Sequence, residues 1–254
     1  DPGLDDNLFI KFPHLAWMNK HQELLDRAKG FKPDLIAMGC LTNLYPFAKV
    51  MAEKLKKTMP DVPILMGGHH AQALPGWLLE NDPNIDMVCL GEGEIAILEL
   101  CNRMQRGEDY TDVPTLWVRE NGLIHRNEMG PLENDLDSLP FPEKQLWYEY
   151  GCFKDNLEVF TGRGCPFKCT FCNIHYQRSI FKDAGDFLRK RSIANVIDEL
   201  KQNLTKYDVK YVSVHDDNFT TNPKWVEEFC EHYRKEINLP WYCFGYPTTL
   251  RPKL

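Results

Sequence analysis

The sequence lacks the features typical of membrane-spanning, secreted and nucleic-acid-binding proteins. No apolar run approaches the roughly 18–20 residues that a helix needs to cross a bilayer. The stretch from Asp1 to Asp6 has neither the basic nor the apolar region of a signal peptide. With a net charge of −7 and a pI of about 5.6, the chain offers no basic surface for duplex nucleic acid. Internal repeats and low-complexity segments are also missing, and these absences together favour a soluble, cytoplasmic enzyme.

The nine cysteines fall into two groups. Six are scattered, mostly in apolar stretches where a reduced cysteine packs as a small hydrophobic side chain: Cys40, Cys89, Cys101, Cys152, Cys230 and Cys243. The other three, Cys165, Cys169 and Cys172, lie within eight residues. A tight cluster with an odd number of cysteines is not typical of a disulfide framework, so it indicates a metal site in a reducing compartment.

Residues 1–110 alternate predicted strands with predicted helices. Apolar runs predict strands over 34–39, 63–67 and 86–90. Two helices are predicted from apolar stripes at helical spacing, one with Phe47, Val50, Met51 and Leu55 and one with Ile95, Ile97, Leu98 and Cys101. Strands separated by helices imply right-handed crossovers and a parallel sheet. We therefore expect an α/β fold with a doubly wound, flavodoxin- or Rossmann-like sheet.

Residues 111–155 predict a hairpin and a linker between two domains. The segments 115–118 and 123–125 flank Asn121-Gly122, a strong hairpin signal. Within 135–142 two prolines push their predecessors away from helical backbone, which predicts an extended linker. The domain boundary is placed there.

A second α/β series is predicted over 156–254, with strands over 157–161, 210–214 and 241–246. One intervening helix runs from Ser192 to about residue 204, and the next begins at Pro223 after the cap residue Asn222. Apolar side chains are predicted to face inward from both helices: Ile193, Val196, Ile197 and Leu200, then Val226, Phe229, Cys230 and Tyr233. Three βα repeats do not close a barrel, so we expect the first part of a TIM-type barrel whose remainder is absent. The basic residues Arg189, Lys190 and Arg191 could reach a carboxylate or a phosphate, but we favour a solvated charge run.

Cys165, Cys169 and Cys172 follow a predicted strand with C-x3-C-x2-C spacing. Three thiolates this close can hold three corners of an iron–sulfur cubane and leave the fourth iron open to a chelating ligand. A zinc site is the alternative, because His175 lies three residues beyond Cys172 and Cys3His sites exist. Structural zinc sites usually pair two short knuckles, and a second knuckle is missing from the sequence, so we favour the cluster.

Asp216, Asp217 and Asn218 directly follow the predicted strand 210–214. Parallel α/β sheets present their binding groups at the carboxyl ends of strands, so these residues are predicted to share a face with the cysteines. The alternative is a polar turn in which Asp and Asn satisfy backbone groups.

The segment from Thr161 to Cys172 resembles the signature of the radical S-adenosylmethionine superfamily, including an aromatic residue, Phe171, before the third cysteine. The resemblance covers residues 157–254. It implies that S-adenosylmethionine chelates the open iron and that one electron cleaves it to methionine and a 5′-deoxyadenosyl radical. It also implies that polar residues at 216–218 help to hold the ammonium group of S-adenosylmethionine.

Two glycine-rich blocks follow predicted strands: Gly67-Gly68-His69-His70 and Gly91-Glu92-Gly93-Glu94. Glycine there permits close backbone approach to a ligand, although such turns occur in any doubly wound sheet. In this order the blocks resemble the cobalamin-binding domains that precede many radical S-adenosylmethionine barrels. The resemblance implies that these loops, with Thr42, enclose the nucleotide tail and flank the corrin, and that the domain's first strands are missing upstream.

The D-x-H-x-x-G motif, which supplies a histidine ligand to cobalt in some cobalamin domains, is absent from the sequence. His69 and His70 are alternative ligands. In the family this stretch belongs to the tail side, so we expect cobalamin without a protein ligand to cobalt.

The resemblance implies an enzyme that uses a [4Fe–4S] cluster, S-adenosylmethionine and cobalamin to methylate an unactivated carbon or a phosphinate centre. One alternative within the family is a radical reaction without methyl transfer, such as the oxidative ring formation of anaerobic porphyrin cyclases. An iron–sulfur electron-transfer module without turnover is the alternative from another class. The expected partners are a small-molecule or peptide substrate and a reductant such as flavodoxin or ferredoxin, with neither nucleic acid nor membrane.

Overall fold

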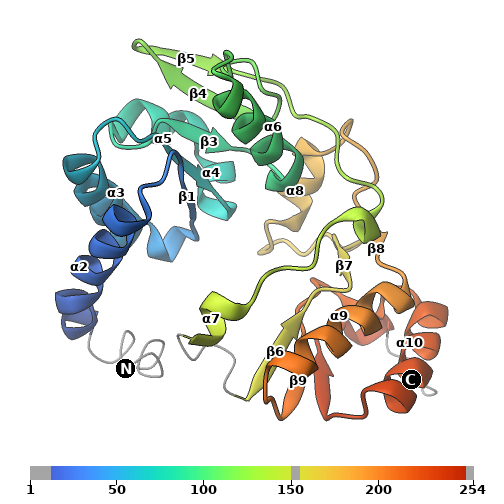
Figure 1. The fold of residues 1–254 in the computed structure, drawn as a ribbon. Helices are drawn as coiled ribbons and strands as arrows, with labels where there is room; N and C mark the ends of the chain where they lie inside the picture. The colour runs from blue at the N-terminus through green and yellow to red at the C-terminus, as the bar shows by residue number, and fades with distance from the viewer. Residues whose placement is uncertain (1–12, 150–154, 250–254) are drawn as a thin grey trace. The chain divides into compact units, whose positions relative to one another are not determined.

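The computed structural model describes residues 13–149 and 155–249, which divide into two compact units (Figure 1). The first unit ends at Pro131 and the second begins at Leu132. Cys152, which is predicted to pack in a core, lies outside the described residues. Over the part of the chain that is described, no helix combines the length and the apolar character needed to cross a membrane.

The first unit is built on a five-stranded sheet with its strands in chain order. The strands are β1 (Ile36–Gly39), β2 (Ile64–Gly67), β3 (Met87–Cys89), β4 (Leu116–Glu120) and β5 (Leu123–Arg126). The first three are parallel and the last two antiparallel. The helices are α2 (Pro13–Phe31), α3 (Tyr45–Thr58), α4 (His69–Ala73), α5 (Pro75–Asn81) and α6 (Gly93–Arg106), with a short 3-10 turn η2 at Thr42–Leu44. The three predicted strands and both predicted helices are confirmed, whereas α2 was not predicted.

Alternating side chains of β2 and β3 fill a core on each face of this sheet. Ile64 and Met66 pack with residues of α3 and α5 in one core, whereas Leu65 packs with Ala96 and Leu100 of α6 in the other. Because side chains alternate across a strand, helices on both faces are needed to cover them. The predicted doubly wound arrangement is therefore confirmed for the parallel strands.

The hairpin belongs to the first unit and is not a segment between domains. β4 pairs with β3, placing Leu116 opposite Cys89, and the turn residues Asn121 and Gly122 have φ values of 50° and 79°. The prediction that residues 111–155 form a hairpin and linker between two domains is therefore wrong for the hairpin. Its strand β4 satisfies the backbone groups along the open edge of β3. Arg119 strengthens this attachment by donating to the carbonyls of Leu79, Asp82, Pro83 and Ile85.

The predicted apolar stripe of α6 is confirmed for Ile97, which packs against the core, but it is wrong for its other three residues. Leu98 is 63% exposed, and Ile95 and Cys101 are also exposed. The buried positions are Ala96 and Leu100, one turn apart. The small Ala96 side chain lets the helix lie close to β2 and β3, and a one-residue offset rotates the buried face by about 100°.

The second unit contains a parallel three-stranded sheet ordered β10-β9-β6. Its strands are β6 (Asn156–Val159), β9 (Tyr211–Val214) and β10 (Trp241–Cys243), and a separate two-stranded ladder joins β7 (Gly162–Arg163) to β8 (Arg189–Lys190). The helices are α7 (Gln145–Glu149), α8 (Ile174–Ile180), α9 (Ile193–Lys206) and α10 (Pro223–Glu236). Short 3-10 turns are η3 (Leu136–Ser138), η4 (Phe219–Thr221) and η5 (Pro247–Thr249). Strand, helix and strand alternate as predicted for the start of a β/α barrel.

Both long helices of this unit begin at the predicted caps. The Ser192 side chain accepts from the Asn195 amide at 3.1 Å, and the Asn222 side chain accepts from the Trp225 amide at 3.3 Å. Such caps satisfy amide groups that the first helical turn leaves open. The inward faces are also confirmed, with Val196, Leu200 and Phe229 among the fully buried side chains and Cys230 half-buried.

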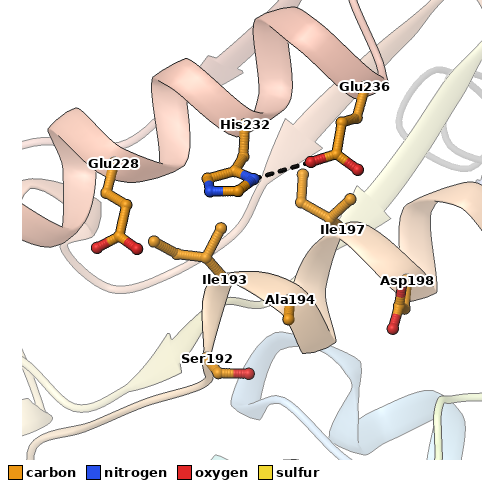
Figure 2. A pocket seen from close by; sticks show the side chains of 8 residues that line it. All are labelled: Ser192, Ile193, Ala194, Ile197, Asp198, Glu228, His232 and Glu236. Carbon is orange, nitrogen blue, oxygen red and sulfur yellow. Dashed lines mark hydrogen bonds and ion pairs between the residues drawn. The ribbon is translucent and has the colours of Figure 1, made fainter.

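A groove of about 440 Å³ runs between α9 and α10, on the side of the helices where Ile193, Ile197 and His232 meet (Figure 2). His232 Nδ1 lies 2.8 Å from Glu236 Oε1, and Lys201 approaches the other oxygen of Glu236 at 2.5 Å. Hydrogen bonds from Lys201 and His232 lower the pKa of Glu236 to about 2. These pairs satisfy the acidic side chain within the protein, so the groove does not define a ligand site.

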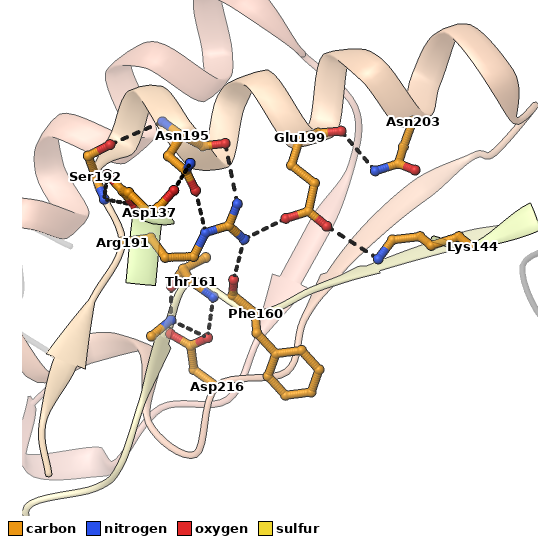
Figure 3. A network of polar contacts seen from close by, with 11 residues as sticks. Asp137, Lys144, Phe160, Thr161, Arg191, Ser192, Asn195, Glu199, Asn203 and Asp216 are labelled. Atoms are coloured by element: carbon orange, nitrogen blue, oxygen red, sulfur yellow. Dashed lines mark hydrogen bonds and ion pairs between the residues drawn. The ribbon is translucent and has the colours of Figure 1, made fainter. Parts of the chain in front are cut away.

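The segment predicted as an extended linker is docked on the second unit. Asp137 accepts from the Ser192 amide at 3.0 Å, and Lys144 reaches the buried Glu199 at 3.2 Å (Figure 3). Arg191 pairs with the same carboxylate at 2.5 Å. A buried carboxylate needs such partners, so residues 135–144 are held in place by charge as well as by Leu136 packing.

Candidate functional site

The three clustered cysteines lie on a loop that leaves the sheet after β6. We refer to residues 161–172 as the cysteine loop; it includes β7 and ends just before α8. Cys165, Cys169 and Cys172 are free thiols and each is partly exposed. The Cys172 amide donates to the Cys169 carbonyl at 3.0 Å, which makes a tight turn between the last two. The loop thus carries three reduced sulfur donors at the carboxyl end of a parallel strand.

Two glycines and one arginine shape the start of the cysteine loop. A side chain at Gly162 would lie 2.6 Å from the Arg189 carbonyl, and Gly164, at φ +82°, lies directly against the Phe187 carbonyl. Only glycine permits this close approach to the returning chain. Arg178 of α8 donates to the Cys165 carbonyl, and also to that of Pro166 at 3.3 Å, fixing the backbone of the first cysteine.

The donor set fits an iron–sulfur cluster better than zinc. His175 Nδ1 lies 2.7 Å from the Cys172 carbonyl, so this ring is engaged with the backbone of the loop. Among the described residues, His, Cys, Asp and Glu side chains are nowhere gathered in threes closely enough to hold a metal ion. Three free thiols without a fourth protein donor are what a cubane with one open iron requires. Binding the cluster would draw the three sulfur atoms together.

The six scattered cysteines differ from this group. Cys40 and Cys89 are buried, Cys230 and Cys243 are half-buried, and burial raises the pKa of each of these four thiols. A protonated, enclosed thiol is inert, which agrees with the predicted packing role. Cys101 is the exception, since it is exposed on α6.

Asp216, at the end of β9, is buried beneath the start of the cysteine loop. Its Oδ1 accepts from the Thr161 amide at 2.6 Å and its Oδ2 from the Thr161 hydroxyl at 2.5 Å (Figure 3). The Gly162 amide adds a third hydrogen bond at 3.2 Å. The residue therefore shares a face with the cysteines, as predicted, but the protein itself supplies its hydrogen-bond partners.

The basic run at 189–191 is not a solvated segment, contrary to the prediction. Arg189 is 7% exposed, and Lys190 Nζ lies 2.6 Å from Asp216 Oδ2. Lys190 also lies over the Phe219 and Trp225 rings, with distances of 4.8 and 4.5 Å to their centroids. The alternative, that this run reaches a carboxylate, is confirmed for Lys190; the sequence could not name Asp216 as its partner because the two residues are 26 positions apart.

The other two polar residues after β9 differ in burial. Asp217 is exposed. Asn218 is 3% exposed, and its Oδ1 accepts from the amide of Thr220 at 3.2 Å and from its hydroxyl at 3.0 Å. Its Nδ2 has no hydrogen-bond partner among the described residues. Because a backbone amide fixes Oδ1 as the acceptor, the open Nδ2 can only donate.

The cysteine loop also contacts the segment after β10. The Phe167 ring stacks on Tyr246 with centroids 3.9 Å apart and planes at 21°. Phe171 projects outward and is 92% exposed. These aromatic side chains place apolar surface beside the three thiols, which a large organic ligand of the cluster can use.

In the first unit the predicted cobalamin residues lie at the carboxyl ends of the parallel strands. Gly68, at φ +86°, packs against Cys40, where an added side chain would lie 2.8 Å from the carbonyl oxygen. The neighbouring His70 is 4% exposed, with Nδ1 3.3 Å from the Thr42 hydroxyl. His70 Nε2 is buried and has no hydrogen-bond partner among the described residues. Gly67 and His69 complete this turn.

The second glycine block follows β3. Gly91, Glu92, Gly93 and Glu94 run from the end of the strand into α6. The Leu90 amide donates to the carbonyl of Thr115 at 3.0 Å, and Thr115 has an unusual φ of 74° for a β-branched residue. The two blocks thus lie at the same end of one sheet, where a ligand of an α/β fold binds. These glycine turns, which leave room for no side chain at Gly68, fit close approach of such a ligand to the backbone.

Comparison with known families assigns both units. The B12 binding domain family matches residues 10–101, and the radical SAM superfamily matches residues 159–251. The chain belongs to the radical SAM proteins that carry a B12-binding domain. This assignment implies cobalamin, S-adenosylmethionine and a [4Fe–4S] cluster as cofactors.

Several curated proteins are similar to this chain along most of its length. An uncharacterized methyltransferase of Pyrococcus horikoshii, PH0819, is 29% identical over 89% of this chain and 49% of its own length. Cytidylyl-2-hydroxyethylphosphonate methyltransferase of Streptomyces wedmorensis is 25% identical over 84% and 45%. An anaerobic magnesium-protoporphyrin IX monomethyl ester cyclase of Cereibacter sphaeroides is 29% identical over 83% and 34%. The chain spans half of their length or less.

Two solved structures share the fold. OxsB, a cobalamin-dependent S-adenosylmethionine radical enzyme, superposes with a TM-score of 0.72 at 18% identity, over 89% of this chain and 32% of that protein. TsrM, a radical S-adenosylmethionine methyltransferase from Kitasatospora setae, gives 0.66 at 17% identity, over 86% and 43%. The α/β architecture of both units is therefore that of this class of enzymes.

Proposed function

We propose that the protein is a cobalamin-dependent radical S-adenosylmethionine methyltransferase acting on an unactivated carbon or a phosphinate centre. The observation that carries this proposal is the presence of three free thiols, Cys165, Cys169 and Cys172, in a radical SAM domain on the same chain as a B12-binding domain. Relatives named as methyltransferases support the reaction class.

The residues of the cysteine loop would hold three corners of the cluster and leave one iron open for S-adenosylmethionine. When bound, the cluster and cobalamin supply the radical and methyl-transfer chemistry, and the protein supplies their placement. Gly164 and Arg178 fix the backbone at Cys165 before any ligand binds. Phe171 and the Phe167–Tyr246 stack would offer apolar surface to S-adenosylmethionine bound at the cluster.

Asp217 and Asn218 are proposed to hold the methionine part of S-adenosylmethionine. The Asp217 carboxylate is exposed and directly follows Asp216, which contacts the start of the loop, and a carboxylate suits the ammonium group. The Asn218 Nδ2 can only donate, so it suits a carboxylate or hydroxyl oxygen and not an ammonium. Asp216, assigned the same role from sequence, already accepts its hydrogen bonds from Thr161, Gly162 and Lys190.

The first unit is proposed to hold the cobalamin tail between its two glycine blocks and Thr42. The residues proposed to line it are Thr42, Gly67, Gly68, His69, Gly91, Glu92, Gly93 and Glu94. The His70 ring is enclosed within the unit, so it is not positioned on the surface as a cobalt ligand. We therefore propose cobalamin without a protein ligand to cobalt.

We also propose that the substrate is a small molecule or a peptide. The proposed electron donor is a one-electron reductant of the flavodoxin or ferredoxin type, and the proposed location is the cytoplasm. The reduced thiols of the described residues support a reducing compartment. The named relatives whose substrates are stated act on small molecules, a cytidylyl phosphonate and a porphyrin ester.

The cyclase relatives favour a second candidate, a radical reaction without methyl transfer. Anaerobic turnover with dithionite and methyl-labelled S-adenosylmethionine separates the two. A methyltransferase releases both S-adenosylhomocysteine and 5′-deoxyadenosine, whereas a cyclase-type reaction releases 5′-deoxyadenosine without labelled product. If neither nucleoside forms while the cluster is intact, the chain is an electron-transfer module and the proposal is wrong.

A further inference from the structure

We propose that Asp216 is a positioning residue for the cysteine loop and that the cation it holds is the protein's own Lys190 and not the ammonium of S-adenosylmethionine. This inference rests on the proposed cluster at Cys165, Cys169 and Cys172. It deepens that proposal by naming the pair that sets the loop's geometry.

The hydrogen bonds of Asp216 leave little room for a ligand. Oδ1 accepts from the amides of Thr161 at 2.6 Å and Gly162 at 3.2 Å. Oδ2 accepts from the Thr161 hydroxyl at 2.5 Å and from Lys190 Nζ at 2.6 Å. A carboxylate has about four acceptor sites, and all four directions are used by the protein. The residue is 4% exposed, which excludes solvent from the carboxylate as well.

The hydrogen-bond donors to Asp216 come from both ends of the chain segment that carries the cysteines. Thr161 and Gly162 lie where the chain leaves β6, and Lys190 lies on β8, where it returns. The two ends also pair directly, through the β7–β8 ladder and the Arg191 amide, which donates to the Thr161 carbonyl at 2.9 Å. Asp216 of a third segment therefore closes the base of a loop that contains all three thiols.

Lys190 is built to serve as an internal counter-ion. Its ammonium lies over two aromatic rings, Phe219 and Trp225, and the Asp216 carboxylate opposes the burial that lowers the pKa of this lysine. Its aliphatic stem crosses Gly162 so closely that a side chain there would lie 2.7 Å from Lys190 Cδ. Aromatic faces and one carboxylate together stabilise a desolvated cation. This explains why Gly162 lacks a side chain at the first turn of the loop.

Isosteric amides test the pair. In Asp216→Asn one oxygen still accepts from both backbone amides, but the new NH₂ group faces the Lys190 ammonium, donor against donor. Combining it with Lys190→Gln removes both charges and lets the two amides hydrogen-bond to each other. The double variant should therefore recover what each single variant loses.

Glu199→Gln is a matched control. Glu199 is 1% exposed and is paired with Lys144 and Arg191, so its loss also leaves buried cations uncompensated (Figure 3). Both partners of its carboxylate, Lys144 and Arg191, lie outside residues 162–172, however. The control thus removes the charge of a buried carboxylate, as Asp216→Asn does, and it reaches the cysteine loop only indirectly, through Arg191, whose amide donates to the Thr161 carbonyl.

Two measurements read the loop directly. Alkylation rates of the three thiols, measured in iron-free protein, report how readily the loop opens. This measurement does not depend on cluster assembly. In Asp216→Asn they should rise on the order of tenfold, because loss of the closing contacts favours local opening. The electron paramagnetic resonance spectrum of the reduced cluster, recorded before S-adenosylmethionine is added, should change as well. Asp216→Asn with Lys190→Gln should restore both signals, and Glu199→Gln should leave both as in the wild type.

Other results would overturn the inference. If Asp216→Asn keeps wild-type alkylation rates and spectrum but loses affinity for S-adenosylmethionine, Asp216 contacts the ligand directly. If Glu199→Gln changes both signals as much as Asp216→Asn does, the effect is general destabilisation. Should Asp216→Asn fail to fold, Lys190→Gln takes its place: this single variant should change both signals, and the double variant should restore them. A wild-type chain that assembles no cluster would refute the proposed function instead, and the alkylation rates would still decide the role of Asp216.

Discussion

The ring of His70 stacks on that of Tyr45, with centroids 4.3 Å apart and planes at 27°. The Tyr45 hydroxyl in turn donates to the buried Asp82 at 3.1 Å, and His70 Nδ1 faces the Thr42 hydroxyl. The histidine of the first glycine block is thus part of the core of the B12-binding unit. This arrangement has consequences for both its stability and its ligand.

The stability of the first unit should fall as pH drops below about 6.5. Burial lowers the pKa of both His70 and His21 in the folded protein, whereas the unfolded side chains titrate near 6.5. Unfolding therefore takes up protons below that pH, and the free energy of unfolding decreases. Urea denaturation between pH 5 and about 7.5 measures this slope. The His70→Phe variant should show a shallower slope, and an unchanged slope would contradict the assignment.

Cob(II)alamin bound to the protein should lack a histidine ligand. Electron paramagnetic resonance should show no nitrogen superhyperfine splitting from the protein, because the His70 ring is enclosed within the unit. The spectrum of His69→Ala serves as the control for the exposed neighbour. Splitting that disappears in either histidine variant would identify a cobalt ligand and refute this prediction.

Each of Cys165, Cys169 and Cys172 should be needed for the cluster. Reconstituted wild-type protein should hold about four irons and four sulfides per chain, and an alanine at any of the three should abolish cleavage of S-adenosylmethionine. Cys101→Ala, at an exposed site on α6, should keep full iron content and activity. Full activity in Cys169→Ala would rule out the cluster assignment.

Asp217→Ala should lower the affinity for S-adenosylmethionine while leaving iron content unchanged. A charge-assisted hydrogen bond contributes about 1.5–3 kcal/mol, and about 1.4 kcal/mol corresponds to a factor of ten. Loss of one such bond should weaken binding roughly tenfold to a hundredfold. Isothermal titration under anaerobic conditions measures it, with Lys224→Ala as an outlying control. Unchanged affinity in both Asp217→Ala and Asn218→Ala would mean that the turn is structural.

A matched pair on α6 tests which face of this helix is buried. Leu100 is fully buried, so Leu100→Ala should cost about 2–5 kcal/mol of unfolding free energy. Leu98 is 63% exposed, so Leu98→Ala should change stability by less than about 0.5 kcal/mol. Chemical denaturation of the two variants provides the comparison, and equal losses would contradict the observed orientation.

Local patterns in the sequence determined much of this protein. The apolar runs predicted the strands, the Asn222-Pro223 pair predicted the start of α10, and the spacing of Cys165, Cys169 and Cys172 predicted the metal chemistry. These features depend on residues close in the chain, so a single sequence contains them. The Asn121-Gly122 turn was equally clear, because its backbone angles are nearly restricted to such residues.

Other features depended on which segments meet in space. Periodicity alone could not choose between the Leu98 and Leu100 faces of α6, since both carry apolar side chains and only the approach to β2 and β3 selects one. Likewise, Lys190 and Asp216 are ordinary charged residues in the sequence, and only the return of β8 beside β9's end brings them within 2.6 Å. Burial of that pair then decides its role, because a desolvated charge must be compensated by whatever the fold places beside it.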